Sequence, residues 1–191
     1  SMSCSDNPLT NLRIGQGYDV HAFAEGRKLI LGGTWTFRMV GGLLGHSDAD
    51  VLAHAISDAL LGGVRGGDIG KLSPDTDPAY KNADSLKLLE AVAAFVRDRG
   101  YEILDVDSVI AAQAPKLSPY RDQMRQNLAQ AIGGFGDSVG VKATTTERLG
   151  FEGREEAIRY RSLFALSMSL GVGCPELQPA RFAMLQFHID S

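Results

Sequence analysis

Hydrophobic side chains recur at helical spacing in three stretches of the chain, at residues 51–60, 86–96 and 119–132. Ser47 or Asp48 can cap the first predicted helix, and a Gly-Gly pair at 62–63 ends it. Asp84 or Ser85 can cap the second, and Ser118-Pro119 opens the third. The apolar positions expected to face inward are Val51, Leu52, Ala55, Ala59, Leu60, Leu86, Leu89, Val92, Phe95, Val96, Met124, Leu128 and Ile132.

Other stretches are rich in β-branched and aromatic residues, as strands are. Residues 12–37 predict two or three strands with a turn at Gly32-Gly33, and further strands are expected at 105–112, 138–143 and 158–169. Residues 66–81 form a long polar connection, a kind of loop that is often functional. Because strands and helices alternate without a strict βαβ order, we expect an α/β fold of the α+β sandwich type. One mixed sheet would be covered by one helical layer.

The composition fits one soluble globular domain. The chain has 191 residues, of which 44% are hydrophobic and 22% charged, and its formal net charge is -4. Lys and Arg are scattered, so we expect no nucleic-acid partner. The longest apolar run, at 163–172, is shorter than the roughly 20 residues that span a bilayer, so we expect no membrane partner.

The ends of the chain carry less information. We expect residues 1–11 to be a flexible N-terminus that includes a cloning remnant, 12–172 to be the domain, and 173–191 to be a tail of unknown role. Cys4 and Cys174 form no metal-type pair and predict free thiols in a reducing compartment. With no secretory signal present, we expect a cytoplasmic location of the bacterial type. A plastid transit peptide that has been removed would leave no trace in this sequence.

Three histidines between residues 21 and 54 suggest a metal site. Asp19 and His21 are two apart on a predicted strand and therefore share a face, and His54 lies on the first predicted helix. Two imidazoles and one carboxylate suit catalytic zinc, and they equally suit non-haem iron. Asp50 and Asp58 lie four residues to either side of His54. They either orient its ring or form a solvated polar face.

Three further segments can bind anions or polar ligands, although each also has an ordinary structural explanation. The threonines at 144–146 and Glu147 suit phosphate oxygens and a hard divalent ion, or belong to a plain Thr-rich strand. Residues 111–118 can present main-chain groups to a base, or simply connect a strand to a helix. The acidic loop at 67–78 can bind polyol hydroxyls, or is merely solvated.

Taken together, the chain resembles the 2-C-methyl-D-erythritol 2,4-cyclodiphosphate synthase family. Six motifs follow in family order over about three quarters of the chain, from about residue 12 to residue 156. The motifs are Gly17-Tyr18-Asp19-Val20-His21, Gly45-His46-Ser47-Asp48-Ala49-Asp50, Gly67-Asp68-Ile69-Gly70, Pro74-Asp75-Thr76-Asp77-Pro78, Ala112-Gln113-Ala114-Pro115-Lys116 and Lys142-Ala143-Thr144-Thr145-Thr146-Glu147.

The resemblance implies a homotrimer with active sites between subunits. The expected reaction is the non-mevalonate step that converts 4-diphosphocytidyl-2-C-methyl-D-erythritol 2-phosphate into the cyclic diphosphate and CMP, by attack of the 2-phosphate on the β-phosphate. It also implies that Asp19, His21 and His54 bind Zn²⁺, that Glu147 binds Mg²⁺ or Mn²⁺, and that His46 and Thr145 hold the reacting phosphates. The implied substrate-binding residues are Ser47, Asp68, Ile69, Gly70, Ser73, Pro74, Asp75, Thr76, Asp77, Phe151 and Arg154. The implied nucleotide-binding residues are Ala112, Gln113, Ala114, Pro115, Lys116, Leu117, Thr144 and Thr146.

The last predicted strand departs from the family pattern. Arg159, Tyr160 and Arg161 are bulkier and more charged than the small residues expected there, in a region that lines the trimer axis in the family. Two other functions use the same ligand set. One is a metal phosphohydrolase or iron oxygenase, and the other is a non-enzymatic, zinc-stabilised trimer that binds nucleotides or isoprenoid phosphates.

Overall fold

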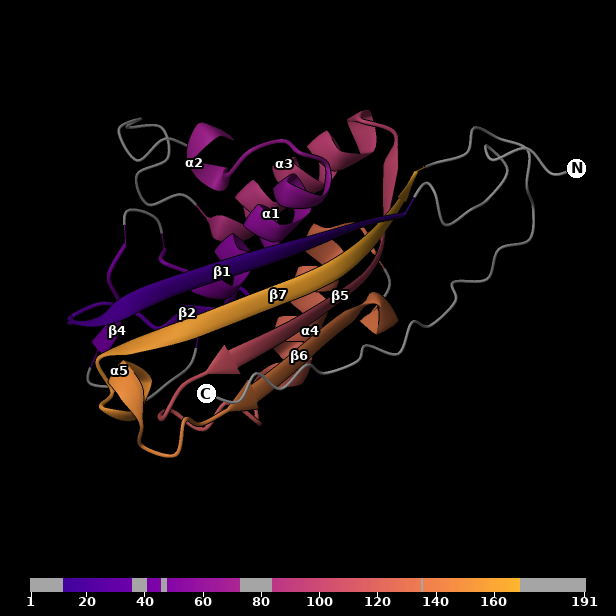
Figure 1. The fold of residues 1–191 in the computed structure, drawn as a ribbon. Helices are drawn as coiled ribbons and strands as arrows, with labels where there is room; N and C mark the ends of the chain where they lie inside the picture. Colours follow the sequence, from indigo (N-terminus) through magenta and orange to yellow (C-terminus); the bar gives the residue numbers. More distant parts are fainter. Residues whose placement is uncertain (1–11, 36–40, 46–47, 73–83, 135, 169–191) are drawn as a thin grey trace, which may run out of the picture.

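The computed structural model describes residues 12–35, 41–45, 48–72, 84–134 and 136–168. Five strands form one sheet in the order β4-β1-β7-β5-β6, and β2 and β3 form a separate two-stranded hairpin (Figure 1). The strands are β1 (Leu12–Glu25), β2 (Ile30–Leu31), β3 (Thr34–Trp35), β4 (Gly41–Leu43), β5 (Tyr101–Ala111), β6 (Val139–Thr144) and β7 (Ala157–Met168). The helices are α1 (Val51–Gly63), α2 (Ile69–Leu72), α3 (Ser85–Asp98), α4 (Arg121–Ala131) and α5 (Gly150–Gly153), and a 3-10 turn spans Gly136–Ser138.

The sheet is mixed, as expected. β5 and β6 are parallel, whereas β7 runs antiparallel to both β1 and β5. It follows that β1, β5 and β6 all end at the same edge of the sheet. Arg159 pairs with Val20 on one side and Ala111 on the other, so the end of β5 lies level with the metal-ligand motif of β1.

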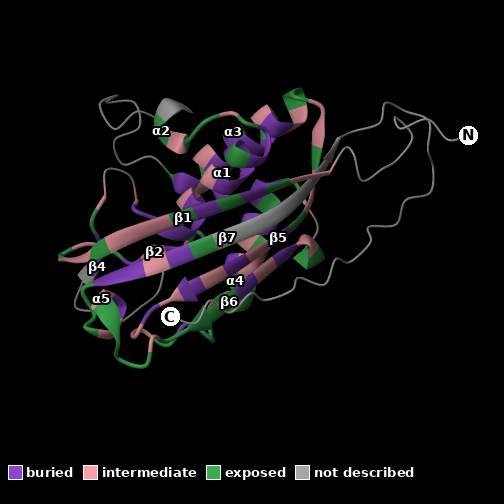
Figure 2. Cartoon of the chain, viewed as in Figure 1, coloured by how far each residue is buried: buried purple, intermediate pink, exposed green. Residues whose placement is uncertain are grey.

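The helices α1, α3 and α4 form the expected single layer on one face of the sheet (Figure 1). The α1 helix packs on β1 and β7 and against α3, and for this reason it is buried on nearly all sides (Figure 2). Gly15 and Gly17 of β1 face the helices and are buried, whereas Ile14, Gln16 and Tyr18 alternate with them on the open face and are exposed. Along the described part of the chain, no helix is long and apolar enough to cross a bilayer.

The polar connection expected at 66–81 contains a short helix, α2, which was not predicted, and some boundaries of the predicted elements differ by a few residues. The strand expected from residue 105 begins earlier, at Tyr101, and the helix expected to open at Ser118-Pro119 begins at Arg121. Asp84 caps α3 as expected, since its side chain accepts a hydrogen bond from Leu86 N. The prediction of Ser47 or Asp48 as the cap of α1 was wrong, because Asp50 holds that position.

Asp50 connects the start of α1 to the β2–β3 hairpin. One carboxylate oxygen accepts from Gly32 N at 2.9 Å and from Ala53 N at 3.2 Å, and the other accepts from Gly33 N at 2.6 Å. Both glycines have positive φ, as the expected two-residue turn between β2 and β3 requires. Burial raises the pKa of Asp50 to about 6, although the three N–H groups oppose this rise. The Asp50 side chain therefore anchors the start of α1 to the hairpin. It does not belong to a solvated polar face of the helix.

Tyr160 of β7 is wholly buried on the helix side of the sheet, and burial raises the pKa of its hydroxyl well above the ordinary value. Among the described residues, this hydroxyl has no hydrogen-bond partner. Its neighbours Arg159 and Arg161 point to the opposite face, where Arg161 lies over the Tyr18 ring at 5.9 Å. The bulky Tyr160 is therefore a core residue, and only the two arginines alter the open face.

The contact between α1 and β1 depends on Gly17, where the helix backbone comes closest to the sheet. A methyl group at Gly17 would lie 1.8 Å from the Ala55 carbonyl oxygen and 2.8 Å from Ala59 N. We expect Gly17→Ala to force α1 away from β1 and to lower the free energy of unfolding by about 3 kcal/mol or more, the upper end of overpacking effects. Urea denaturation followed by circular dichroism measures this loss.

Gly62→Ala is the matched control, because Gly62 also belongs to α1 but the nearest atom to its added methyl group is 4.0 Å away. This variant should gain up to about 1 kcal/mol from helix propensity. Equal stability of the two variants would contradict the packing constraint at Gly17.

Candidate functional site

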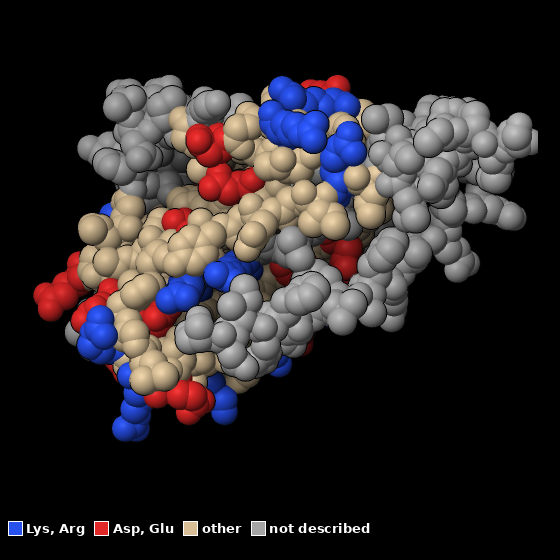
Figure 3. All heavy atoms as spheres, viewed as in Figure 1, with Lys and Arg blue, Asp and Glu red and all other residues tan. Residues whose placement is uncertain are grey.

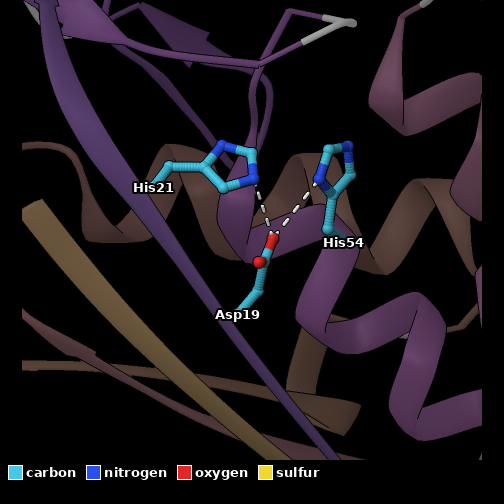
Figure 4. Close-up of side chains that lie close together, drawn as sticks. All are labelled: Asp19, His21 and His54. Carbon is cyan, nitrogen blue, oxygen red and sulfur yellow. Dashed lines mark ion pairs between the residues drawn. The ribbon is translucent and has the colours of Figure 1, made fainter. Parts of the chain in front are cut away.

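Asp19, His21 and His54 come together where α1 crosses β1 (Figure 4). Asp19 Oδ2 lies 3.1 Å from His21 Nε2 and 3.4 Å from His54 Nδ1. The two imidazole rings meet edge to face, with their centroids 5.4 Å apart. All three side chains are partly buried, with exposed fractions of 26%, 15% and 17%. The cluster predicted from sequence is thus confirmed as an arrangement of side chains.

The donor geometry fits a divalent metal ion. In a tetrahedral zinc site with metal–ligand distances of 2.0–2.1 Å, neighbouring donor atoms lie about 3.3–3.4 Å apart. The distances from Asp19 to the two histidines come close to this value, and all three donor atoms lie within 4.8 Å of one another. Three protein ligands leave a tetrahedral position free for a substrate oxygen, as catalytic sites do.

Electrostatics keep Asp19 ionised and His54 basic. Burial alone would raise the pKa of Asp19, but the hydrogen bonds and charges of His21 and His54 outweigh it and hold that pKa well below its usual range. Burial lowers the pKa of His54, but the hydrogen bond and charge of Asp19 reverse this and raise it above 6.5. At a pH below the raised pKa of His54, a metal ion must therefore displace a proton from this ring, while Asp19 is ready to bind.

Asp50 and Asp58, one of which could have oriented the His54 ring, both have other partners. Asp50 binds backbone N–H groups at the start of α1, and Asp58 accepts from Ile69 N at 2.7 Å. The second nitrogen of His54, Nε2, lies instead 3.0 Å from Ser85 Oγ. Sequence reasoning had considered Ser85 only as a helix cap, because a contact between residues 31 positions apart leaves no periodic signal.

Asp58 positions part of the predicted substrate loop. Its bond to Ile69 N fixes the start of α2, and this places Asp68 and Gly70 beside the end of α1. Burial, followed by the charges of Asp19 and Asp68, raises the pKa of Asp58 despite the hydrogen bond from Ile69. Seven other predicted residues of the phosphate and substrate sites lie outside the described residues. They are His46, Ser47, Ser73, Pro74, Asp75, Thr76 and Asp77.

The predicted nucleotide loop at 112–117 and the threonine segment at 144–147 lie side by side, because they follow the parallel strands β5 and β6. Ala112 N donates to Thr144 O at 3.0 Å, and Arg148 N donates to the side-chain oxygen of Gln113 at 3.2 Å. Ala112 and Leu117 are buried and anchor the loop, while Lys116 is exposed. The peptide bond between Ala114 and Pro115 is cis.

Glu147 lies in a strained turn. It has a φ of 53° and Arg148 a φ of 67°, values that side-chain-bearing residues rarely adopt. Glu147 N and its carboxylate both contact Thr145 Oγ1, at 3.4 Å and 3.2 Å. Such strain often accompanies functional segments. Among the described residues, however, the metal-ligand cluster consists of Asp19, His21 and His54 without Glu147.

Arg154 and Phe151 lie near the start of β7. Arg154 forms a forked ion pair with Glu156, at 2.7 Å and 3.1 Å, on the exposed surface. The guanidinium carbon of Arg159 lies over the Phe151 ring, 5.0 Å from the ring centroid. Arg159 also forms an ion pair with the buried Glu152. The burial of Glu152 in this ion pair was not predicted, because Glu152 looks like an ordinary surface residue in the sequence.

Three comparisons with known proteins agree with the geometry. A model of the YgbB family matches residues 12–167. A 2-C-methyl-D-erythritol 2,4-cyclodiphosphate synthase of Bacillus cytotoxicus is 55% identical over 154 residues, which are 81% of this chain and 97% of the relative. One of Geotalea uraniireducens is 60% identical over 147 residues, which are 77% and 93% of the two chains. A structure named IspF of Plasmodium falciparum in complex with CDP shares 32% identity and a TM-score of 0.72, covering 83% of this chain and 97% of that one.

Metal affinity should depend on pH through His54. Because the metal needs neutral imidazole and the pKa of His54 is raised, affinity should be highest at alkaline pH and fall as the pH drops through that pKa. Below it, each pH unit should weaken Zn²⁺ binding roughly tenfold for one displaced proton. Competition with a chromophoric chelator between about pH 8 and about pH 6 measures this, with the chelator's own protonation taken into account. A flat profile would contradict the assignment of His54 as a ligand.

Proposed function

The chain belongs to the YgbB family, to which its 2-C-methyl-D-erythritol 2,4-cyclodiphosphate synthase relatives belong, and from this we propose that it catalyses the same cyclisation. Its substrate is 4-diphosphocytidyl-2-C-methyl-D-erythritol 2-phosphate. An oxygen of the 2-phosphate forms a bond to the β-phosphorus, the bond from that phosphorus to the CMP oxygen breaks, and CMP leaves with the electron pair. The observation that carries the proposal is the convergence of Asp19, His21 and His54 on one point.

The reaction needs no protein nucleophile, and the protein's task is therefore positioning and charge neutralisation. Holding two reacting groups of one molecule in contact can lower a barrier by about 7–11 kcal/mol. A divalent ion bound by Asp19, His21 and His54, which we propose is Zn²⁺, supplies Lewis-acid polarisation of a phosphate oxygen. His46 and the Thr145 hydroxyl hold the phosphates, and Asp68 and the acidic loop after it hold the methylerythritol hydroxyls.

The loop at 112–117 binds the cytidine through its main chain, with Thr144 and Thr146 beside it. Support comes from the pairing of this loop with the threonine segment at the ends of β5 and β6. Glu147 lies in that segment and binds a second ion, Mg²⁺ or Mn²⁺, next to the diphosphate. An exposed carboxylate held in a strained turn, outside the metal-ligand cluster, suits such an ion, which needs few protein ligands.

The complete site forms between neighbouring copies of the chain in a homotrimer. One chain supplies the metal-ligand cluster and another supplies the threonine segment and the nucleotide loop. Two features support this arrangement. The open face of the sheet exposes Ile14 by 66% and Tyr18 by 48%, apolar surface that a neighbouring copy would cover, and residues 142–145 and Glu147 are exposed. Phe151 and Arg154 border this site or the cavity on the trimer axis. The catalytic domain is residues 12–172.

Phosphorus NMR of the reaction distinguishes this function from its alternatives. With substrate, Zn²⁺ and Mg²⁺, the protein should release CMP and the cyclic diphosphate together. Turnover of His54→Ala should fall by more than about 100-fold, since removing a ligand exceeds the 10–100-fold effect of outer partners. CMP with an open-chain product would indicate a phosphohydrolase. Binding without turnover would indicate a zinc-stabilised binding protein, and either result would overturn the proposal.

Glu147→Gln separates the two proposed ions. It removes the charge that binds the second ion but leaves the cluster of Asp19, His21 and His54 intact. We expect turnover to fall roughly 100-fold, as for the loss of one electrostatic group at a transition state. Zinc content by atomic emission should stay at the wild-type level. Zinc lost in this variant would show that the two ions do not bind independently.

A further inference from the structure

The ring of His54 is held from both sides. Its Nδ1 faces Asp19 Oδ2 at 3.4 Å, and its Nε2 lies 3.0 Å from the hydroxyl oxygen of Ser85. Ser85 is the first residue of α3 and is 1% exposed. A metal ion at the cluster would therefore take the Nδ1 lone pair, and Ser85 Oγ would accept a hydrogen bond from Nε2–H.

The direction of each hydrogen bond follows from Asp48. Its carboxylate contacts both the Ser85 hydroxyl and Ser85 N, the latter at 3.1 Å. An ionised carboxylate only accepts, so the Ser85 hydroxyl must donate to Asp48. The hydroxyl oxygen can then only accept from His54, and this requires a proton on Nε2 of the ring. The chain of contacts from Asp48 through Ser85 to His54 thus selects one tautomer, in which Nδ1 carries the lone pair that a metal ion would take.

This chain of contacts is built into the helix layer. Asp48 Oδ1 also accepts from Asp50 N at 3.1 Å, which ties Asp48 to the buried cap of α1. Asp50, Asp48 and Ser85 accordingly connect the start of α1 to the start of α3. His21 differs, because its Nδ1 is buried without a hydrogen-bond partner among the described residues. The orientation of the metal site therefore depends more on the contacts of His54 than on those of His21.

We propose that Ser85 and Asp48 are positioning residues that fix the tautomer and orientation of His54 for metal binding. The inference deepens the proposed function, because it rests on the metal site described there. Neither residue belongs to the metal-ligand cluster of Asp19, His21 and His54. Each acts through the His54 ring, in the way that a carboxylate behind a ligating histidine raises metal affinity. Asp48 acts at one remove, with the Ser85 hydroxyl between it and the ring.

Ser85→Ala tests the proposal, with Ser57→Ala as its matched control. Ser57 is also a buried serine; it lies on the same helix as His54, and its hydroxyl donates to Ala53 O at 2.8 Å. Zn²⁺ affinity, measured by chelator competition, should weaken by about 10–100-fold in Ser85→Ala. It should change by less than about twofold in Ser57→Ala, since that hydroxyl does not reach the ring. Equal weakening in both variants would mean a general effect of lost stability and would overturn the proposal.

The imidazole N–H protons give a second readout that does not depend on metal loading. In ¹⁵N-labelled wild type and Ser57→Ala, the Nε2–H proton of His54 should exchange slowly with water and be visible in proton NMR. In Ser85→Ala it should exchange too fast to observe. A persistent Nε2–H resonance in Ser85→Ala, or its absence from the wild type, would overturn the proposal.

Asp48→Asn shows whether Asp48 acts through Ser85. It should weaken Zn²⁺ binding in the wild-type background and have no further effect in Ser85→Ala, because the intermediate hydroxyl is then gone. Additive losses would show that Asp48 acts by another route. If wild-type protein binds no Zn²⁺ at this cluster, the proposed metal site fails, and the NMR resonance alone then decides whether Ser85 holds the ring.

Discussion

The contact of α1 with β1 at Gly17 is the constraint on which the metal site depends. Since Gly17 has no side chain, the helix backbone reaches the strand at Ala55 and Ala59. Asp19 and His21 follow Gly17 on the same face of β1, and His54 precedes Ala55 on the helix. The distance between helix and strand therefore sets the distance between ligands, and a side chain at position 17 would disturb both.

Acidic side chains hold the start of this helix in place. Asp50 is buried and binds three backbone N–H groups from the β2–β3 turn and from α1. Asp48 binds the start of α3 through Ser85. A buried carboxylate would be costly without such donors, and the donors in turn are satisfied only while the hairpin and both helices keep their places. The acids in this segment thus serve the geometry of the site, although their spacing alone also suits ligand binding.

The proposed site is divided between two regions of the sheet. The metal-ligand cluster lies on the helix side of β1, whereas the threonine segment and the nucleotide loop extend from the ends of β5 and β6. The opposite face carries exposed Ile14 and Tyr18 with Arg161 over the tyrosine ring. Figure 3 shows both acidic and basic side chains on the visible face, with no surface of one sign covering it. The separation of the two regions and the exposed open face support the proposal of a site shared between copies of the chain.

The sequence by itself determined most element types, the single helical layer, the Gly32-Gly33 turn and the candidate metal ligands Asp19, His21 and His54. These depend on local rules: helical and strand periodicity, turn chemistry, and the shared face of Asp19 and His21 on a strand. Only the tertiary structure decided which acid caps α1, that Tyr160 enters the core, that Glu152 pairs with Arg159, and that Ser85 rather than Asp50 or Asp58 contacts His54. Each of these outcomes depends on contacts between residues distant in the sequence or on burial. Such properties are set by how α1, α3 and the sheet pack together, and no local pattern encodes them.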